Sequence, residues 1–213
     1  PLFNGANIIK FNQIEKYLEN LKPENSKNKL GGLFKVKHKS HFILIDVDTP
    51  PQKKFSKSYQ SGPLSFEYFL DGIKIITNSG FGNHISKKAE LVSRLTACQS
   101  TLTINDTSIT KFERNEMINR VFGNSIKNDF KFFDFISKNE NGLIGCAASN
   151  NGYEKKFGCT HKREIYIDKN NNNLKGIDHI YKIKDGYPIR YAFRFHINPE
   201  LNVFKTMSGN SAL

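Results

Sequence analysis

The stretch LSFEYFLDGIKII, from Leu64 to Ile76, decides the fold class. Apolar and polar side chains alternate through 64–70, as they do on a β-strand with one buried face. Asp71 and Gly72 follow, and glycine readily takes the positive φ that a tight hairpin turn requires. A second apolar run, Ile73–Ile76, comes directly after the glycine. The stretch therefore predicts a β-hairpin that turns at Asp71-Gly72.

Further strand-like runs lie on both sides of this hairpin. Upstream, 32–37 alternates, and 41–47 is a continuous apolar run suited to a buried strand, ended by Thr49-Pro50-Pro51. Downstream, we expect an exposed turn at 168–173 and strands at 100–104, 130–136, 143–147, 163–167, 191–197 and 203–205. Many short strands joined by turns predict an all-β fold, a large antiparallel β-sandwich of two curved sheets.

One segment near the start has strong helical periodicity. Apolar residues fall at 11, 14, 18 and 21, and Pro23 ends the pattern. We therefore divide the chain into a short N-terminal helix with its polar linker, 1–29, and a β-sandwich domain, 30–213.

The composition narrows the classes of partner. The 213 residues include 32 Lys and Arg against 20 Asp and Glu, a net charge of +12. Such an excess favours nucleic acid, anionic lipid or an acidic polysaccharide as partner, but lysines spread along the chain are equally well explained as a solvated surface. Nucleic acid is disfavoured, because the sequence has no stripe of interleaved aromatics and arginines. No apolar run is long enough to span a bilayer, and three cysteines without CxxC spacing predict buried thiols.

Several phrases, taken in order, resemble the β-domain of heparinase II/III-like proteins in the form found among proteobacterial members. They are Leu2–Gly5, Asp46–Pro51, Leu64–Glu67, Asn78–Gly80, Arg94–Asp106, Asn151–Tyr153, Gly158–Arg163 and Arg194–Pro199. No single phrase is specific, whereas six of them in the right order are. The resemblance covers the chain almost end to end. It implies the C-terminal part of a longer bacterial protein, periplasmic or cytoplasmic, whose N-terminal α/α-toroid domain is a partner of this one.

The resemblance also implies a chemistry. Family lyases cleave uronic-acid polysaccharides by β-elimination, which needs neutralisation of the uronate carboxylate, a base for the carbon-bound proton and an acid for the leaving oxygen. In the family these groups lie largely on the toroid. We therefore expect this chain to line the cleft for an acidic polysaccharide and to be inactive by itself. The alternative is a non-catalytic carbohydrate-binding, polyanion-binding or structural module.

The sandwich of the family also carries a zinc site, and this sequence departs from it at every ligand. The first His of the family pattern corresponds to Gln60, the Asp to Gly62 and the second His to Gln99. Glutamine is a poor zinc ligand and glycine offers no side chain. We therefore expect no zinc and no other cofactor. Gln60 and Gln99 are expected to hydrogen-bond to one another or to the main chain where the metal would be.

Four polar residues remain as candidates for contact with substrate, and none is a candidate for catalysis. Tyr153 could stack on a sugar ring, and His161 and Arg163 could lie at the rim of the cleft, with the arginine clamping a carboxylate. The alternative is that His161 and Arg163 are buried structural partners on one strand. Arg94 is open to the same two interpretations.

Overall fold

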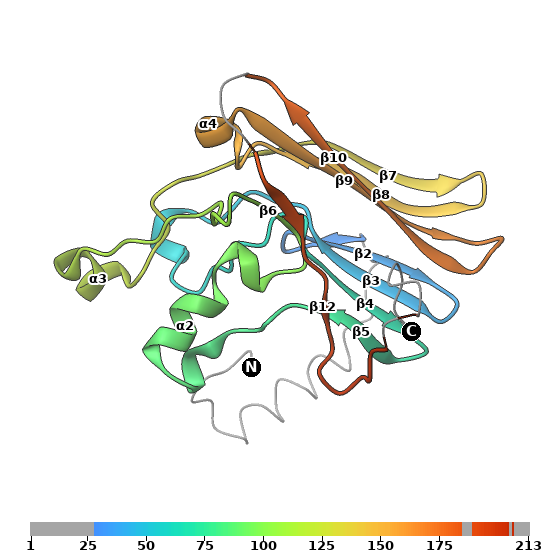
Figure 1. The fold of residues 1–213 in the computed structure, drawn as a ribbon, viewed down its shortest axis with the longest axis horizontal. Coiled ribbons are helices and arrows are strands. Elements are labelled where there is room, and N and C mark those ends of the chain that lie inside the picture. The colour runs from blue at the N-terminus through green and yellow to red at the C-terminus, as the bar shows by residue number, and fades with distance from the viewer. Residues whose placement is uncertain (1–27, 185–188, 205, 207–213) are drawn as a thin grey trace, which may run out of the picture.

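The structure is a computed structural model that describes residues 28–184, 189–204 and 206. Two antiparallel sheets lie face to face (Figure 1). The larger contains, in spatial order, β1 (Lys29–Leu30), β2 (Leu33–His38), β3 (His41–Asp46), β4 (Phe66–Leu70), β5 (Ile73–Thr77) and β12 (His196–Ile197). The smaller contains β10 (Asn173–Lys182), β9 (Cys159–Asp168), β8 (Leu143–Asn150) and β7 (Phe132–Glu140). The expected antiparallel β-sandwich is confirmed.

The main core fills the space between these two sheets. On β3, His41, Ile43 and Ile45 are buried, while the residues between them are half-buried. This is the alternation expected where one face of a strand packs inward. From the smaller sheet, Cys146 and Ala148 of β8 and Ile165 and Ile167 of β9 complete the core, whose further members are Phe34, Val36, Val47, Leu64, Phe66 and Tyr68.

The predicted hairpin is confirmed, and it turns at Asp71 and Gly72 as expected. Leu70 pairs with Ile73, so the loop contains two residues. Asp71 has φ of 50° and Gly72 has φ of 79°, which is the combination of two positive φ angles that a type I′ turn requires.

The two ends of the sandwich differ. The turns at 39–40, 71–72, 141–142 and 169–172 lie together at one end, here called the hairpin end (Figure 1). The other, here called the loop end, consists of the segments 49–65, 78–101, 105–131 and 151–158. These segments contain α2 (Lys87–Ser93), α3 (Glu116–Phe122), α4 (Glu154–Phe157) and the 3-10 turns η1 (Lys53–Phe55), η2 (Gly82–His84) and η3 (Thr96–Cys98).

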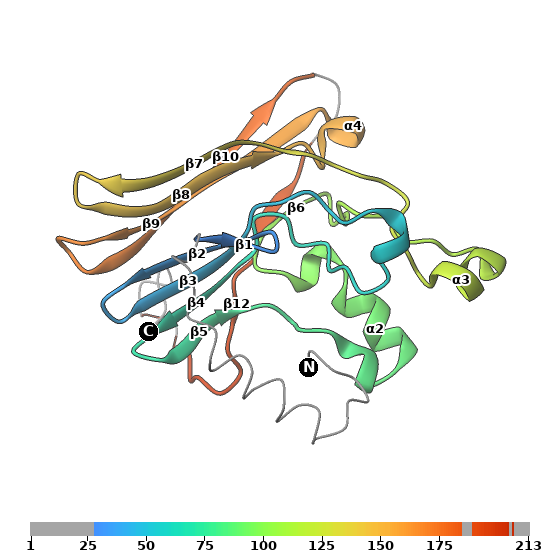
Figure 2. The ribbon, with the colours of Figure 1, turned by 180° about the vertical axis from the view of Figure 1, so that it is seen from behind.

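A second, smaller core supports the loop end. It surrounds the two-stranded sheet of β6 (Leu102–Ile104) and β11 (Tyr191–Phe193), which lies between the main sheets and the loops (Figure 2). Its buried members are Leu102, Ile104, Ile109, Phe130, Tyr153, Phe157 and Cys159. The loops are therefore held on a packed base.

The structure differs from the expected strands at three places. Strand β10 was missed, because Gly176 and Asp178 interrupt its apolar pattern. The run 191–197 is divided between β11 and β12, which belong to different sheets. Residues 203–204 form no strand, and Lys205 lies outside the described residues.

Other expectations are settled in part. Cys146 and Cys159 are buried, whereas Cys98 is half-buried on η3. The helix predicted at 11–21 lies outside the described part of the chain, and the boundary between 29 and 30 stays a prediction. In the part that is described, no helix has the length and apolar character needed to cross a membrane.

Candidate functional site

Gly62 and Gln99, two of the three positions that the sequence resemblance aligns with metal ligands, are in direct contact. A Cβ added at Gly62 would lie 3.0 Å from Gln99 Cγ and 2.6 Å from Ser65 Oγ. The Gln99 side chain is buried, and its Nε2 donates to Ser93 O at 2.8 Å. The expected hydrogen bond to the main chain therefore exists at Gln99, whereas no hydrogen bond joins it to Gln60.

This place does not fit a zinc ion. Within the ranges that the structure describes, no three His, Cys, Asp or Glu side chains lie close enough together to hold a metal. Gln99 already uses its amide, and any side chain at Gly62 would overlap its neighbours. The donor set that zinc prefers is missing here.

Buried hydroxyl groups join the loops around this place instead. Ser61 Oγ donates to Thr110 Oγ1 at 2.8 Å and lies 2.9 Å from Thr96 Oγ1. Thr101 Oγ1 donates to Pro63 O at 2.7 Å. These short side chains connect the loop before β4 to the loops on either side of β6.

Arg94 is hydrogen-bonded to the main chain of the loop before β4. Its side chain is 0 % exposed, and Nε and Nη2 donate to Tyr59 O and Ser56 O, each at 2.9 Å. The guanidinium lies 4.1 Å from the centre of the Phe112 ring, a stacked arrangement that stabilises a buried cation. Burial lowers the pKa of Arg94 to about 10, so the side chain stays charged at neutral pH. The geometry favours the structural interpretation of Arg94.

His161 and Arg163 share one partner, Asp178 of β10. Arg163 donates from Nε to Asp178 Oδ1 at 2.7 Å and from Nη2 to Oδ2 at 2.9 Å, a bidentate pair. His161 Nε2 lies 2.7 Å from the same Oδ1. The carboxylate that Arg163 clamps therefore belongs to this chain and not to a sugar.

Arg163 also reaches across to the larger sheet. Its Nη1 donates to Leu64 O and to Ser100 O, both at 2.8 Å. These carbonyls belong to the two loops that contain Gly62 and Gln99. The guanidinium lies over the rings of Phe66 and Phe195, 5.3 and 5.7 Å from their centres, and the side chain is 2 % exposed. Arg163 therefore joins β9, β10 and both loops.

The charges in this cluster follow from burial and pairing. Burial alone would raise the pKa of Asp178, but hydrogen bonds from His161 and Arg163 outweigh it and hold the pKa at about 2. Burial lowers the pKa of His161, and its hydrogen bond to Asp178 only partly opposes this. At neutral pH the cluster is therefore an arginine–aspartate ion pair with a neutral imidazole beside it.

Tyr153 lies apart from this cluster, in the second core. Its hydroxyl donates to Thr107 O at 2.7 Å, and its ring packs against Phe157. Burial raises its pKa above the ordinary tyrosine value. Because both its ring and its hydroxyl are enclosed, the geometry favours a structural role here too.

One residue of the cluster was missed in the sequence. Asp178 lies on the unexpected strand β10 and is the common partner of His161 and Arg163. The signal that could have found it is the alternation of Leu174, Gly176, Asp178 and Ile180, in which a single acidic residue interrupts an inward-facing series. Such an interruption indicates a buried cation opposite.

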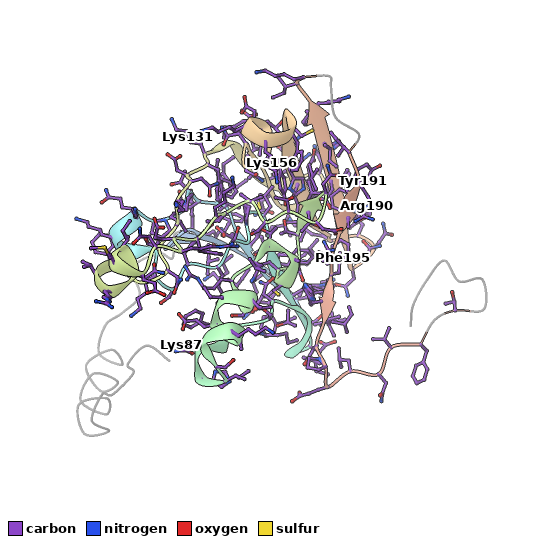
Figure 3. All side chains as sticks on the ribbon, turned by 60° about the vertical axis from the view of Figure 1, so that its left-hand side comes forward. Lys87, Lys131, Lys156, Arg190, Tyr191 and Phe195 are labelled. Atoms are coloured by element: carbon purple, nitrogen blue, oxygen red, sulfur yellow. The ribbon has the colours of Figure 1, made fainter. Side chains whose placement is uncertain are left out.

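The loop end gathers basic side chains from distant parts of the sequence. Apart from the buried Arg94, its four segments contain twelve Lys and Arg against six Asp and Glu. The basic residues are Lys53, Lys54, Lys57, Lys87, Lys88, Lys111, Arg114, Arg120, Lys127, Lys131, Lys155 and Lys156. Figure 3 shows Lys87, Lys131 and Lys156 around this end, with Arg190, Tyr191 and Phe195 along its flank. Residues that are scattered in the sequence thus give this end an excess of positive charge.

Comparisons with known proteins agree with this architecture. The model of the heparinase II/III-like C-terminal domain matches residues 22–213. Among solved structures, a heparan sulfate lyase HepC mutant from Pedobacter heparinus superposes with a TM-score of 0.64 at 15 % identity, over 96 % of this chain and 30 % of that one. A heparinase III with methylated lysines gives 0.59 at 15 % identity, over 93 % and 28 %. The chain therefore spans less than a third of either structure. No curated protein sequence matches it.

Proposed function

This chain belongs to the heparinase II/III-like family through its C-terminal domain, and from that premise we propose that it forms one wall of the cleft in which a polysaccharide lyase binds an acidic, uronate-containing polysaccharide. The observation that carries the proposal is the charge of the loop end, whose segments contain twelve basic residues besides the buried Arg94 and only six acidic ones. A surface of one sign attracts a polymer of the other and raises its local concentration.

The proposal assigns the elimination step to the rest of the full-length protein. β-Elimination needs a base and an acid that touch the sugar. His161, Arg163, Arg94 and Tyr153 are buried and paired within this chain, so they would act on a substrate only by holding the loops in place. The isolated chain is therefore expected to bind substrate without cleaving it.

The proposal also includes a wall that is held without zinc. The hydroxyl bonds of Ser61 and Thr101 and the two carbonyl contacts of Arg163 join the loops that a metal would join. Neither zinc nor a chelator is expected to change activity or the temperature of thermal unfolding.

A lyase assay on the full-length protein tests this function. The protein is incubated with a panel of uronate polysaccharides, and the unsaturated product is followed by its ultraviolet absorbance, with added zinc or with EDTA. We expect product from at least one polymer, equal rates in both conditions, and none from the isolated chain. Activity that EDTA abolishes and zinc restores would overturn the zinc-free wall.

The second candidate is a polyanion-binding module without catalysis. It is favoured by the replacement of all three family ligands, at Gln60, Gly62 and Gln99. If the folded full-length protein binds the polymers but yields no unsaturated product across the panel, this second function replaces the first.

A further inference from the structure

Two grooves lie side by side at the loop end. The first, of ≈ 520 Å³, lies between α2 and the segment 107–114. The second, of ≈ 560 Å³, lies between 49–53 and 126–131. Lys127 lines both grooves, so they meet at this residue.

The grooves combine apolar walls with a basic rim. Leu91, Val92 and Leu95 line the first, and Pro50 and Pro51 line the second. The basic residues that line them are Lys53, Lys111, Arg114, Lys127 and Lys131. Apolar surface beside cations suits a ligand that has apolar ring faces and carries negative charges at its edges.

Two acidic residues line the grooves against these five basic ones, Asp129 in the second and Glu113 in the first. Glu113 offsets little of the charge. Its side chain is 3 % exposed and accepts hydrogen bonds from the main-chain N–H groups of Arg114 and Asn115, at 2.9 and 3.0 Å. These bonds, chiefly that from Asn115, lower its pKa. Lys127 lies 3.3 Å from it but is 52 % exposed, so this ammonium group also faces solvent. Glu113 thus anchors the rim without covering it.

The aromatic residues of the grooves distinguish between two polyanions. Binding of single-stranded nucleic acid relies on open aromatic faces for the bases. Among the lining residues, Phe112 has the Arg94 guanidinium over its ring, and Phe130 is buried. Phe112 is half-buried, so the grooves offer at most one open aromatic face, too few for the stacking of successive bases. A polysaccharide needs no such platform, because its pyranose rings can lie against aliphatic side chains and prolines.

We propose that the two grooves form one continuous track for an acidic polysaccharide, with Lys127 at the junction. This inference rests on the proposed function and adds the place and direction of binding. Oligosaccharides short enough for one groove contact the Lys111–Arg114 side, and longer chains extend past Lys127 towards Lys131. Affinity therefore rises with chain length until both grooves are filled.

Binding of heparin and polygalacturonate oligosaccharides of graded length to the 213-residue chain tests the track. The triple variant Lys111→Gln, Arg114→Gln, Lys127→Gln is expected to lose at least tenfold in affinity for all lengths. The variant Lys131→Gln is expected to weaken only the longer oligosaccharides. The matched control, Lys37→Gln, Lys138→Gln, Lys169→Gln, removes the same charge near the hairpin end and is expected to change affinity less than twofold. Circular dichroism and urea midpoints confirm that each variant is folded.

Three outcomes would overturn the track. Equal weakening by the control variant would mean diffuse attraction by net charge. Full competition by single-stranded DNA of equal charge would mean that the surface does not distinguish a polysaccharide from nucleic acid. Unchanged affinity in the triple variant would place binding elsewhere. The lyase assay separates this inference from the proposed function. If the full-length protein cleaves polysaccharide and the triple variant binds with unchanged affinity, the track alone is rejected. If binding depends on the track residues but the full-length protein cleaves nothing, the lyase function alone is rejected.

Discussion

At the scale of single residues, Arg163 connects the most parts of the fold. Its guanidinium donates to Asp178, Leu64 O and Ser100 O. Replacing Arg163 with Met removes this donor from the two carbonyls and leaves the Asp178 carboxylate with His161 as its remaining partner. Removing one partner of a buried ion pair costs about 3–5 kcal/mol, and we expect Arg163→Met to lower the free energy of unfolding by that amount in urea titrations.

The adjacent lysine provides the control for this prediction. Lys162 pairs with Glu164 at 2.6 Å, but both side chains are partly exposed, and such surface pairs contribute about 0–1 kcal/mol. Lys162→Met should therefore change stability little. Arg163→Lys keeps the charge but loses the planar fork, so it should fall between the two. A loss at Arg163 no larger than that at Lys162 would contradict the structural role.

Because of Asp46, we expect part of the free energy of unfolding to decrease as pH rises, whereas the paired carboxylates make it increase. Burial, and to a smaller degree the charge of Asp48, raises its pKa from 3.8 to about 7. The folded state therefore binds this proton more tightly than the unfolded state, and stability falls as pH rises between these two values. Asp46→Asn should be more stable than the parent at about pH 8, by at most ~4 kcal/mol, and equally stable at about pH 4. Urea titrations of both proteins across this range measure the difference, and a constant difference would refute it.

At the scale of elements, the turn of the β4–β5 hairpin depends on one glycine. Gly72 has φ of 79°, and an added Cβ would meet no atom within 4 Å, so the cost of a side chain is backbone strain alone. Gly72→Ala should lower the free energy of unfolding by about 1–2 kcal/mol. Gly176 on β10 lacks positive φ and has its nearest atom at 3.9 Å. Gly176→Ala should be neutral or stabilise by about 0.5 kcal/mol. Equal losses in thermal unfolding would count against this explanation.

Elements could be predicted from the sequence where local pattern and tertiary role agree. At 64–76 the alternation, the Asp-Gly turn and the pairing of Leu70 with Ile73 all specify one hairpin. At β10 they disagree, because Asp178 occupies an inward position where an apolar residue is expected. Its carboxylate is satisfied by Arg163 of β9. The partner that makes β10 a strand lies elsewhere in the chain, so the local pattern could not indicate it.

At the scale of the whole molecule, the same limit applies to charge. Lys53, Lys87, Lys127 and Lys156 are far apart in sequence, and nothing local relates them. The fold brings their segments to one end, because the strands place the turns at 39–40, 71–72, 141–142 and 169–172 at the other (Figure 1). The proximity of Gly62 and Gln99 was easier to anticipate, since the family resemblance aligns both with one metal site, and the two residues are indeed in contact. The proposed binding surface is thus a property of the topology rather than of any motif.

Whether the two cores unfold together can be measured by the reactivity of one buried cysteine in each core. Cys146 lies in the main core and Cys159 in the second, and burial raises the pKa of both thiols, so neither reacts while its core is closed. Strand β9 contributes Ile165 and Ile167 to the main core and Cys159 to the second. Because one strand runs through both cores, we expect a single cooperative transition. In a Cys98→Ser background, pulsed alkylation in urea followed by mass spectrometry should give one midpoint for both thiols. Modification of Cys159 at lower urea than Cys146 would instead make the loop end, with its grooves, a separately unfolding unit.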